Sequence, residues 1–207
     1  DAGQVGSRSA DAVLADLRGL VGLDLVKANV LRLVNFLKVQ QLRRSKGMPE
    51  VTISHHLVFY GNPGTGKTTI ARLIAELYRA LGILSKGHLV ETDRSGLVAG
   101  YVGQTALKVQ EVVNKALGGI LFIDEAYALS GKDGQDFGAE AVETLLKFME
   151  DHREDLAVIV AGYTDKMEAF LTSNPGLKSR FNTYLRFDDY KPDQLSSIFS
   201  TFCHHAG

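Results

Sequence analysis

One glycine-rich segment constrains the fold of this chain more than any other. It runs Gly61-Asn62-Pro63-Gly64-Thr65-Gly66-Lys67-Thr68 and fits the pattern G-x-x-x-x-G-K-[ST] in full. A short apolar stretch with β-forming residues (56–60) precedes it. Apolar residues at helical spacing follow it, namely Ile70, Leu73, Ile74 and Leu77. A strand, a glycine loop and a helix in this order surround an anion with backbone N–H groups and the positive end of a helix dipole. The segment therefore predicts a phosphate-binding loop.

The motif assigns a task to the polar residues of this loop. Lys67 reaches the β- and γ-phosphates of a nucleotide, and the Thr68 hydroxyl binds Mg²⁺. A glycine-rich turn without a ligand is the alternative, but the flanking strand and helix favour the functional interpretation. The candidate nucleotide-binding residues of the loop are Asn62, Pro63, Gly64, Thr65, Gly66, Lys67, Thr68 and Thr69.

A pair of acids ends the apolar run 120–123 and supplies the second half of a hydrolytic site. Ligands of parallel sheets bind beyond the carboxyl ends of the strands, where Asp124 and Glu125 fall. Asp124 would help Thr68 to position Mg²⁺ through water, and Glu125 would polarise a water at the γ-phosphate. Alternatively, both acids only cap a helix that begins at Ala126. A carboxylate beside the metal-binding acid favours water, rather than a substrate hydroxyl, as the phosphoryl acceptor.

Apolar patterns along the rest of the chain alternate between strand and helix. Predicted strands are 57–60, 88–91, 120–124, 157–161 and 184–187. Predicted helices are 11–17, 24–45, 67–81, 105–117, 139–151 and 192–204. This alternation is typical of an α/β fold, in which helices cover both faces of a parallel sheet.

Composition excludes several classes of protein. The formal net charge of -1 argues against a general nucleic-acid binder. Cys203 is the only cysteine and has no partner for an internal disulfide. The apolar runs 119–123 and 156–162 are too short to span a bilayer. We therefore expect no nucleic-acid partner, no membrane insertion and a cytoplasmic location. The chain starts at Asp1, so we also expect a fragment or processed form of a longer protein.

Several stretches together resemble AAA+ ATPases. The resemblance is to the branch that contains red-type Rubisco activase CbbX, stage V sporulation protein K and the type VII secretion ATPase EccA. The stretches are 20–23, 61–69, 99–105, 118–127, 160–163 and 174–181. The glycine loop and the Asp-Glu pair occur in many P-loop enzymes, whereas Gly-Tyr-Val-Gly at 100–103 and the segment 174–181 are narrower signals.

The resemblance implies a three-layer P-loop domain with a five-stranded parallel sheet in the order 5-1-4-3-2. This AAA+ core would span 18–190, after a leader or linker with a short helix (1–17) and before the start of a C-terminal helical lid (191–207). The implied activity is Mg²⁺-dependent ATP binding and hydrolysis that remodels a protein client. The implied assembly is a ring of identical subunits, a hexamer when the lid is present.

Roles of single residues also follow from the resemblance. Arg180 matches the arginine finger that acts in the neighbouring subunit's site, and Tyr101 with Val102 matches the pore loop that grips the substrate. An ordinary surface arginine and a tyrosine in a turn are the alternatives. Val21 and Gly22 match the segment that packs on adenine.

Two departures from the family limit these expectations. The polar sensor after the fourth strand falls on Tyr163 or Thr164, of which we take Thr164 as the candidate catalytic residue. The family continues into a lid with a second sensor arginine, whereas this chain stops at Gly207. We therefore expect this form to hydrolyse ATP slowly, if at all, and to assemble poorly. A non-catalytic nucleotide-gated scaffold and a small-molecule P-loop kinase remain alternative functions.

Overall fold

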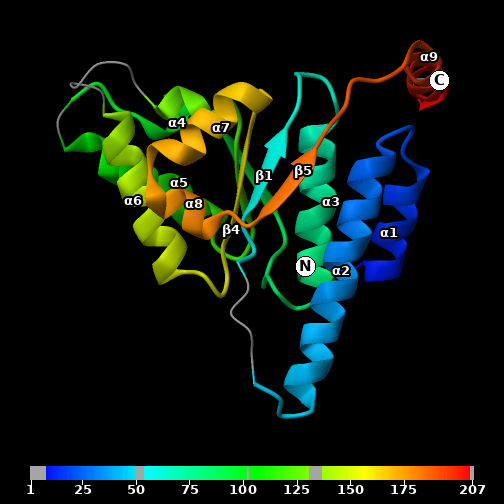
Figure 1. Cartoon of the computed structure of the whole chain (residues 1–207), viewed down its shortest axis with the longest axis horizontal. Helices are drawn as coiled ribbons and strands as arrows, with labels where there is room; N and C mark the ends of the chain where they lie inside the picture. Colours follow the sequence, from blue (N-terminus) through cyan, green and yellow to red (C-terminus); the bar gives the residue numbers. More distant parts are fainter. Residues whose placement is uncertain (1–7, 50–53, 102, 131–136, 206–207) are drawn as a thin grey trace, which may run out of the picture.

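Five parallel strands form the centre of the computed structural model, which describes residues 8–49, 54–101, 103–130 and 137–205 (Figure 1). The strands are β1 (Leu57–Tyr60), β2 (Leu89–Thr92), β3 (Ile120–Ile123), β4 (Ala157–Gly162) and β5 (Thr183–Arg186). Their order in the sheet is β2-β3-β4-β1-β5. This is the expected order 5-1-4-3-2 counted from the opposite edge, so the predicted α/β fold is confirmed.

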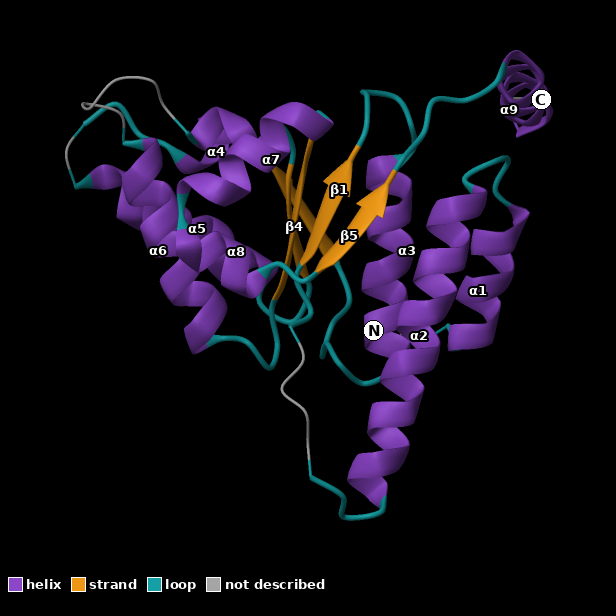
Figure 2. Cartoon of the chain, viewed as in Figure 1, coloured by secondary structure: helices purple, strands orange, loops and turns teal. Residues whose placement is uncertain are grey.

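Helices cover both faces of the sheet and make three layers (Figure 2). One face carries α1 (Ala10–Gly19), α2 (Asp24–Ser45) and α3 (Lys67–Ala80). The other face carries α4 (Arg94–Leu97), α5 (Gln104–Ala116), the 3-10 helix η1 (Ala126–Leu129), α6 (Gly138–Asp151), α7 (Thr164–Ser173) and α8 (Pro175–Arg180). The last helix, α9 (Pro192–His205), lies apart from both layers.

Alternation along the strands explains why the sheet is buried on both faces. Leu57 and Phe59 of β1 point into the cluster that α1, α2 and α3 cover, whereas Val58 between them points into the cluster on the other face. All residues of β3 and β4 are buried. Strands buried on both faces have continuous apolar sequences, which made these runs recognisable.

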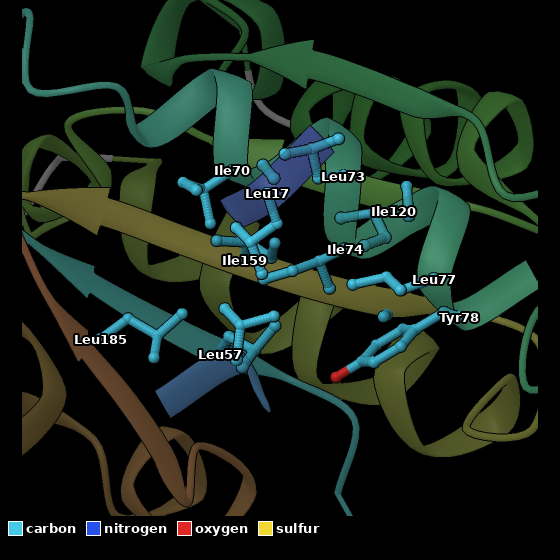
Figure 3. Packing of buried hydrophobic residues seen from close by; sticks show 14 of the residues in the cluster. Leu17, Leu57, Ile70, Leu73, Ile74, Leu77, Tyr78, Ile120, Ile159 and Leu185 are labelled. Carbon is cyan, nitrogen blue, oxygen red and sulfur yellow. The ribbon is translucent and has the colours of Figure 1, made fainter. Parts of the chain in front are cut away.

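The core on the α3 side holds α1 as well as the sheet (Figure 3). Ile70, Ile74 and Leu77 lie on the buried face of α3, and Leu17 of α1 packs into the same cluster. Each fully buried side chain of this kind contributes roughly 1.5–3 kcal/mol to stability. The short helix expected within the leader is therefore packed onto the body, in contact with α3.

The structure contains short elements that the sequence patterns did not predict. These are α4, η1, α7 and α8. The predicted helix 24–45 coincides with α2, and the other predicted elements agree with the structure within a few residues. Leu195, Phe199 and Phe202 of α9 remain exposed, at 52%, 69% and 70%, because α9 does not pack on the core. Across the described segments, no helix has the length and apolar character needed to cross a membrane.

Candidate active site

Strand pairing brings the glycine loop and the acid pair to one edge of the sheet. β1 and β3 both run parallel to β4, one on each side of it, so the carboxyl ends of the three strands lie together. The N–H of Gly61 donates to the carbonyl of Gly162 at 3.1 Å, which joins the start of the loop to the end of β4. The segments after β1, β3 and β4 therefore form the candidate site, at the edge where parallel sheets bind ligands.

Backbone conformation explains the glycines of the loop. Gly64 and Gly66 have φ values of +76° and +88°, in the left-handed region that side chains disfavour. Gly66 caps the N-terminus of α3, so the loop leads directly into the helix. Lys67 begins α3, and its ammonium donates to the carbonyls of Gly61 and Asn62 at 3.0 and 2.7 Å. The ammonium is thus held inside the curve of the loop.

Strand pairing places the acids at the same edge of the sheet as Lys67, and their charges act on its ammonium. Burial lowers the pKa of Lys67 from its ordinary value, and the charges of Asp124 and Glu125 oppose this effect. Both carboxylates are exposed to solvent. Lys67 and the two acids therefore share the carboxyl edge of the sheet, where the sequence analysis expected them.

The acid pair occupies a strained turn after β3. Glu125 has φ 48° and ψ 40°, a left-handed conformation that a residue with a Cβ adopts only at a cost of about 1–3 kcal/mol. Its N–H donates to Asp124 Oδ1 at 3.0 Å, and the Asp124 N–H donates to the carbonyl of Thr92 at 2.9 Å. The Glu125 side chain makes no capping bond to η1. Helix capping therefore does not account for this acid.

Two adjoining cavities open beside the acids. One, of about 460 Å³, is lined by Glu125 together with Asp93 and Arg94. The other, of about 430 Å³, is lined by Asp124 with Thr92 and Asp93. Solvent can therefore reach both carboxylates from the β2 side of the site.

Thr68 and Asp124 carry oxygen atoms of the kind that bind Mg²⁺ together with the phosphates of a nucleotide. Thr68 lies in the first turn of α3, and Asp124 directly follows β3. Mg²⁺ is usually bound through one or two protein oxygens, with phosphate oxygens and water completing the octahedron. No group of three or more His, Cys, Asp or Glu side chains within the described residues could hold a metal ion alone. The metal would therefore depend on the phosphates.

The segment expected to pack on adenine lies between the glycine loop and α9. A Cβ on Gly22 would come within 2.9 Å of Gln194 Nε2. A Cβ on Gly66 would come within 3.0 Å of the Tyr190 hydroxyl and 3.5 Å of Leu23 Cδ1. The segment with Val21 and Gly22, which joins α1 to α2, is thus close to Gly66 at the end of the glycine loop.

The two sensor candidates lie beyond the carboxyl end of β4. Tyr163 is the N-cap residue of α7, and Thr164 is the first residue of that helix. The Tyr163 ring packs on Tyr127, with centroids 6.1 Å apart. Thr164 is half-buried. Both residues therefore lie at the carboxyl edge of the sheet, directly after β4.

Arg180 lies at the other edge of the sheet. It ends α8 before the start of β5, and its carbonyl accepts a hydrogen bond from Ser54, which precedes β1. Its guanidinium forms an ion pair with Glu150 of α6 at 3.3 Å and also donates to the carbonyl of Gly176 at 3.4 Å. The structure therefore does not bring Arg180 together with Lys67 of the same chain.

The candidate pore loop is exposed between α4 and α5. The Tyr101 side chain is 74% exposed, which leaves its ring available to a partner. Val102, the second residue of this prediction, lies outside the described residues.

Sequence reasoning missed a link between the loop and the segment before α9. The Asn62 side-chain amide donates to both carboxylate oxygens of Asp189, at 2.9 and 3.0 Å. The two residues are far apart in the chain, and no local pattern pairs them. Only the parallel pairing of β1 with β5 brings them together.

Comparisons with known proteins show the family of the chain. The sequence model of the ATPase family associated with various cellular activities (AAA) matches residues 57–189. Stage V sporulation protein K of Bacillus subtilis is 46% identical over 88% of the chain and 57% of its own length. The chloroplastic ribulose bisphosphate carboxylase/oxygenase activase of Cyanidioschyzon merolae is 48% identical over 90% of the chain and 64% of its own length.

Protein CbbX of Cereibacter sphaeroides is 47% identical over 91% of the chain and 62% of its own length. The chain thus spans roughly three fifths of these relatives. The matched region contains the glycine loop, the acid pair and Arg180. The chain therefore belongs to the AAA family of ATPases, and it is similar to CbbX and to stage V sporulation protein K.

Proposed function

We propose that this chain is a Mg²⁺-dependent ATPase module that remodels a protein client as part of a ring oligomer. The observation that carries the proposal is the common position of Lys67 and the Asp124–Glu125 pair at the carboxyl edge of the sheet. A buried ammonium, a metal-binding acid and a second acid beside it are the groups that phosphoryl transfer to water needs.

Within this proposal each site residue has a role. Loop amides and Lys67 bind the phosphates of ATP, and Val21 with Gly22 packs on adenine. Thr68 and Asp124 hold Mg²⁺, which neutralises charge on the phosphates when it is bound. Glu125 orients the attacking water, and Thr164 senses the γ-phosphate.

Assembly is supported by the position of Arg180. A guanidinium stabilises charge on the transferred phosphoryl group, but Arg180 lies at the edge opposite its own loop. We therefore assign it to the site of a neighbouring copy, and Tyr101 to the client. The relatives named above include an activase and a sporulation protein, so the ATPase core does not specify the client. A cytoplasmic location belongs to the same proposal.

The test is Glu125→Gln in the full-length protein. Losing a general base lowers rates by about 10²–10⁴, so we expect phosphate release, with water as the only acceptor, to fall by about 10²-fold or more. ATP binding, measured by calorimetry with Mg²⁺ present, should persist. Glu111→Gln is the matched control, because Glu111 is an exposed acid on α5 with no assigned role in the site. It should hydrolyse ATP at the unaltered rate.

Other results would contradict the proposal in distinct ways. Normal turnover by Glu125→Gln would remove the role of this acid. ATP binding without hydrolysis by the unaltered full-length protein would favour a nucleotide-gated scaffold. Phosphoryl transfer to a small molecule instead of water would favour a kinase. If the proposal is right, the Glu125→Gln protein in ATP should also retain its client in a pull-down.

A further inference from the structure

Asn62 joins two parts of the candidate site, because its main chain and its side chain bond to different partners. Its carbonyl accepts hydrogen bonds from the Lys67 ammonium at 2.7 Å and from the Thr65 hydroxyl at 2.8 Å. Its side-chain amide donates to both carboxylate oxygens of Asp189, at 2.9 and 3.0 Å. The ammonium of Lys67 and the carboxylate of Asp189 are therefore bound to the same residue of the glycine loop.

Strand pairing brings Asp189 beside the loop. β5 is the parallel neighbour of β1, and the Phe187 N–H directly after β5 donates to the carbonyl of Tyr60 at 2.7 Å. A Cβ on Gly61 would come within 2.6 Å of the Phe187 carbonyl oxygen, so glycine is needed where the two segments approach. The chain after β5 thus runs against the start of the glycine loop, and Asp189 follows two residues later.

The position of Lys67 depends on carbonyls of the loop. The Lys67 side chain is buried, and the hydrogen bonds that its ammonium makes offset part of the cost of burying a charge. Of the two carbonyls that accept from it, that of Asn62 is nearer than that of Gly61, at 2.7 Å against 3.0 Å. Asn62 itself is exposed, so a bond from its side chain to another segment restricts the freedom of this part of the loop.

We propose that Asp189 is a positioning residue for Lys67, which acts through Asn62. The bonds to Asp189 fix the Asn62 side chain, and the Asn62 carbonyl in turn keeps the ammonium inside the loop, ready for the phosphates. The negative charge of Asp189 would by itself repel a triphosphate. The hydrogen bonds and the charge therefore have opposite effects on ATP affinity, which gives the proposal a sign that can be measured. This inference rests on the phosphate-binding role of Lys67 proposed above.

The test is Asp189→Ala in the full-length protein. Affinity is measured by calorimetry with a non-hydrolysable ATP analogue and Mg²⁺, and turnover is measured by phosphate release. Because both side chains are exposed, we expect an effect at the lower end of the range for hydrogen bonds, a rise of about 3- to 10-fold in the dissociation constant and in KM. The kcat should stay unchanged, since binding lost equally from the ground state and the transition state raises KM alone.

Double variants identify the route of the effect. In the Asn62→Ala background and in the Lys67→Ala background, Asp189→Ala should cause no further loss of affinity, because one member of the connection is already missing. Asp189→Asn keeps an oxygen that can accept from the Asn62 amide. Its loss of affinity should therefore be smaller than that of Asp189→Ala.

Asp188→Ala is the matched control. Asp188 is an exposed acid in the same connection between β5 and α9, and its carboxylate pairs with Arg186 at 3.3 Å. Its removal takes away one negative charge and leaves the bonds between Asn62 and Asp189 intact. Asp188→Ala should bind and hydrolyse ATP like the unaltered protein.

Tighter or unchanged binding by Asp189→Ala would overturn the inference, because the charge would then outweigh or cancel the hydrogen bonds. A fall in kcat as large as the rise in KM would overturn it too and indicate a general structural role. So would an equal loss of affinity with and without the Lys67 side chain, because Asp189 would then act by another route. The proposed function fails separately, if the unaltered full-length protein does not bind ATP or if Glu125→Gln turns over normally.

Discussion

The two edges of the sheet hold their functional residues in different ways. At the carboxyl edge, backbone geometry holds Lys67 and the acid pair, through glycines at positive φ and parallel strand pairing. At the amino edge, Arg180 is held by an exposed Glu150 and a single carbonyl. The four residues of β1 separate the two edges by roughly 13 Å. On the proposed roles, one chain therefore supplies two incomplete halves, and a complete site needs two copies.

Removing Arg180 should produce the largest effect. Loss of an arginine supplied to a phosphoryl-transfer site lowers rates by about 10³-fold or more, so we expect Arg180→Ala to reduce phosphate release by this factor without changing ATP affinity. Mixing Arg180→Ala with Glu125→Gln subunits should restore part of the activity. In such mixtures, the Glu125→Gln subunit supplies its intact Arg180 to the site of an Arg180→Ala subunit, which still has Glu125.

Arg153→Ala is the control for this experiment. Arg153 also pairs with Glu150, at 3.1 Å, so its loss changes the charge at the same edge without removing the proposed finger. It should hydrolyse ATP normally. Mixed subunits that show no recovery would contradict the two-copy arrangement.

Removing Lys67 should give the next largest effect and act within one chain. Hydrogen bonds to charged groups contribute about 1.5–3 kcal/mol, so Lys67→Ala should weaken ATP binding about 10- to 100-fold in calorimetry. Mixing with other variants should not rescue this loss of binding in the altered subunit. Lys147→Ala, which removes an exposed lysine of α6, should bind ATP normally. Equal affinity of the two variants would show that Lys67 does not bind phosphate.

The amino edge should make folding sensitive to acid. Burial lowers the pKa of His56 from 6.5 to about 3, with smaller contributions from His55 and Arg180. The His56 ring accepts a hydrogen bond from the Val158 N–H at 3.0 Å in its neutral form. Between pH 3 and pH 6.5, His56 is protonated in the unfolded chain but neutral in the folded one, so the unfolded chain binds more protons. The stabilisation is therefore complete above pH 6.5 and is lost as the pH falls toward 3, by about 1.4 kcal/mol per unit.

Chemical denaturation at pH 7 and pH 5 would measure this effect. We expect the free energy of unfolding to fall by about 2 kcal/mol between these values because of His56. In His56→Gln this part of the pH dependence should disappear, whereas His152→Gln, which alters a less buried histidine, should keep it. An unchanged slope in His56→Gln would mean that other groups cause the acid sensitivity.

Glu150→Gln should have the smallest effect and tests how Arg180 is held. Exposed ion pairs contribute about 0–1 kcal/mol, and the Glu150 side chain is 55% exposed. Hydrolysis should therefore change by no more than about fivefold, and the unfolding midpoint should hardly move. A loss as large as that of Arg180→Ala would show that Glu150 is indispensable for orienting the guanidinium.

The sheet could be predicted from the sequence because each central strand is buried on both faces. The resulting apolar runs, such as 120–123 and 157–162, end at turns that the glycine loop and the acid pair mark. Helix α7 was missed although Met167, Phe170 and Leu171 have helical spacing, because the helix begins directly after β4. Helix α8 is too short for periodicity, and only the Asn174 cap indicates where it begins.

The site could be predicted only where its residues are close in sequence. The order of Lys67 and Thr68, and of Asp124 and Glu125, is a local pattern. The pairing of Arg180 with Glu150 depends on how α8 packs beside α6, which no spacing encodes. The left-handed conformation of Glu125 likewise results from the packing of the turn, since Glu has no intrinsic preference for it.

The bond between Asn62 and Asp189 has a mechanical consequence. Residues 187–191 connect β5 to α9, and within them Asp189 is bound to Asn62 of the glycine loop. Any displacement of Asp189 itself must therefore break these two bonds or move Asn62 with it.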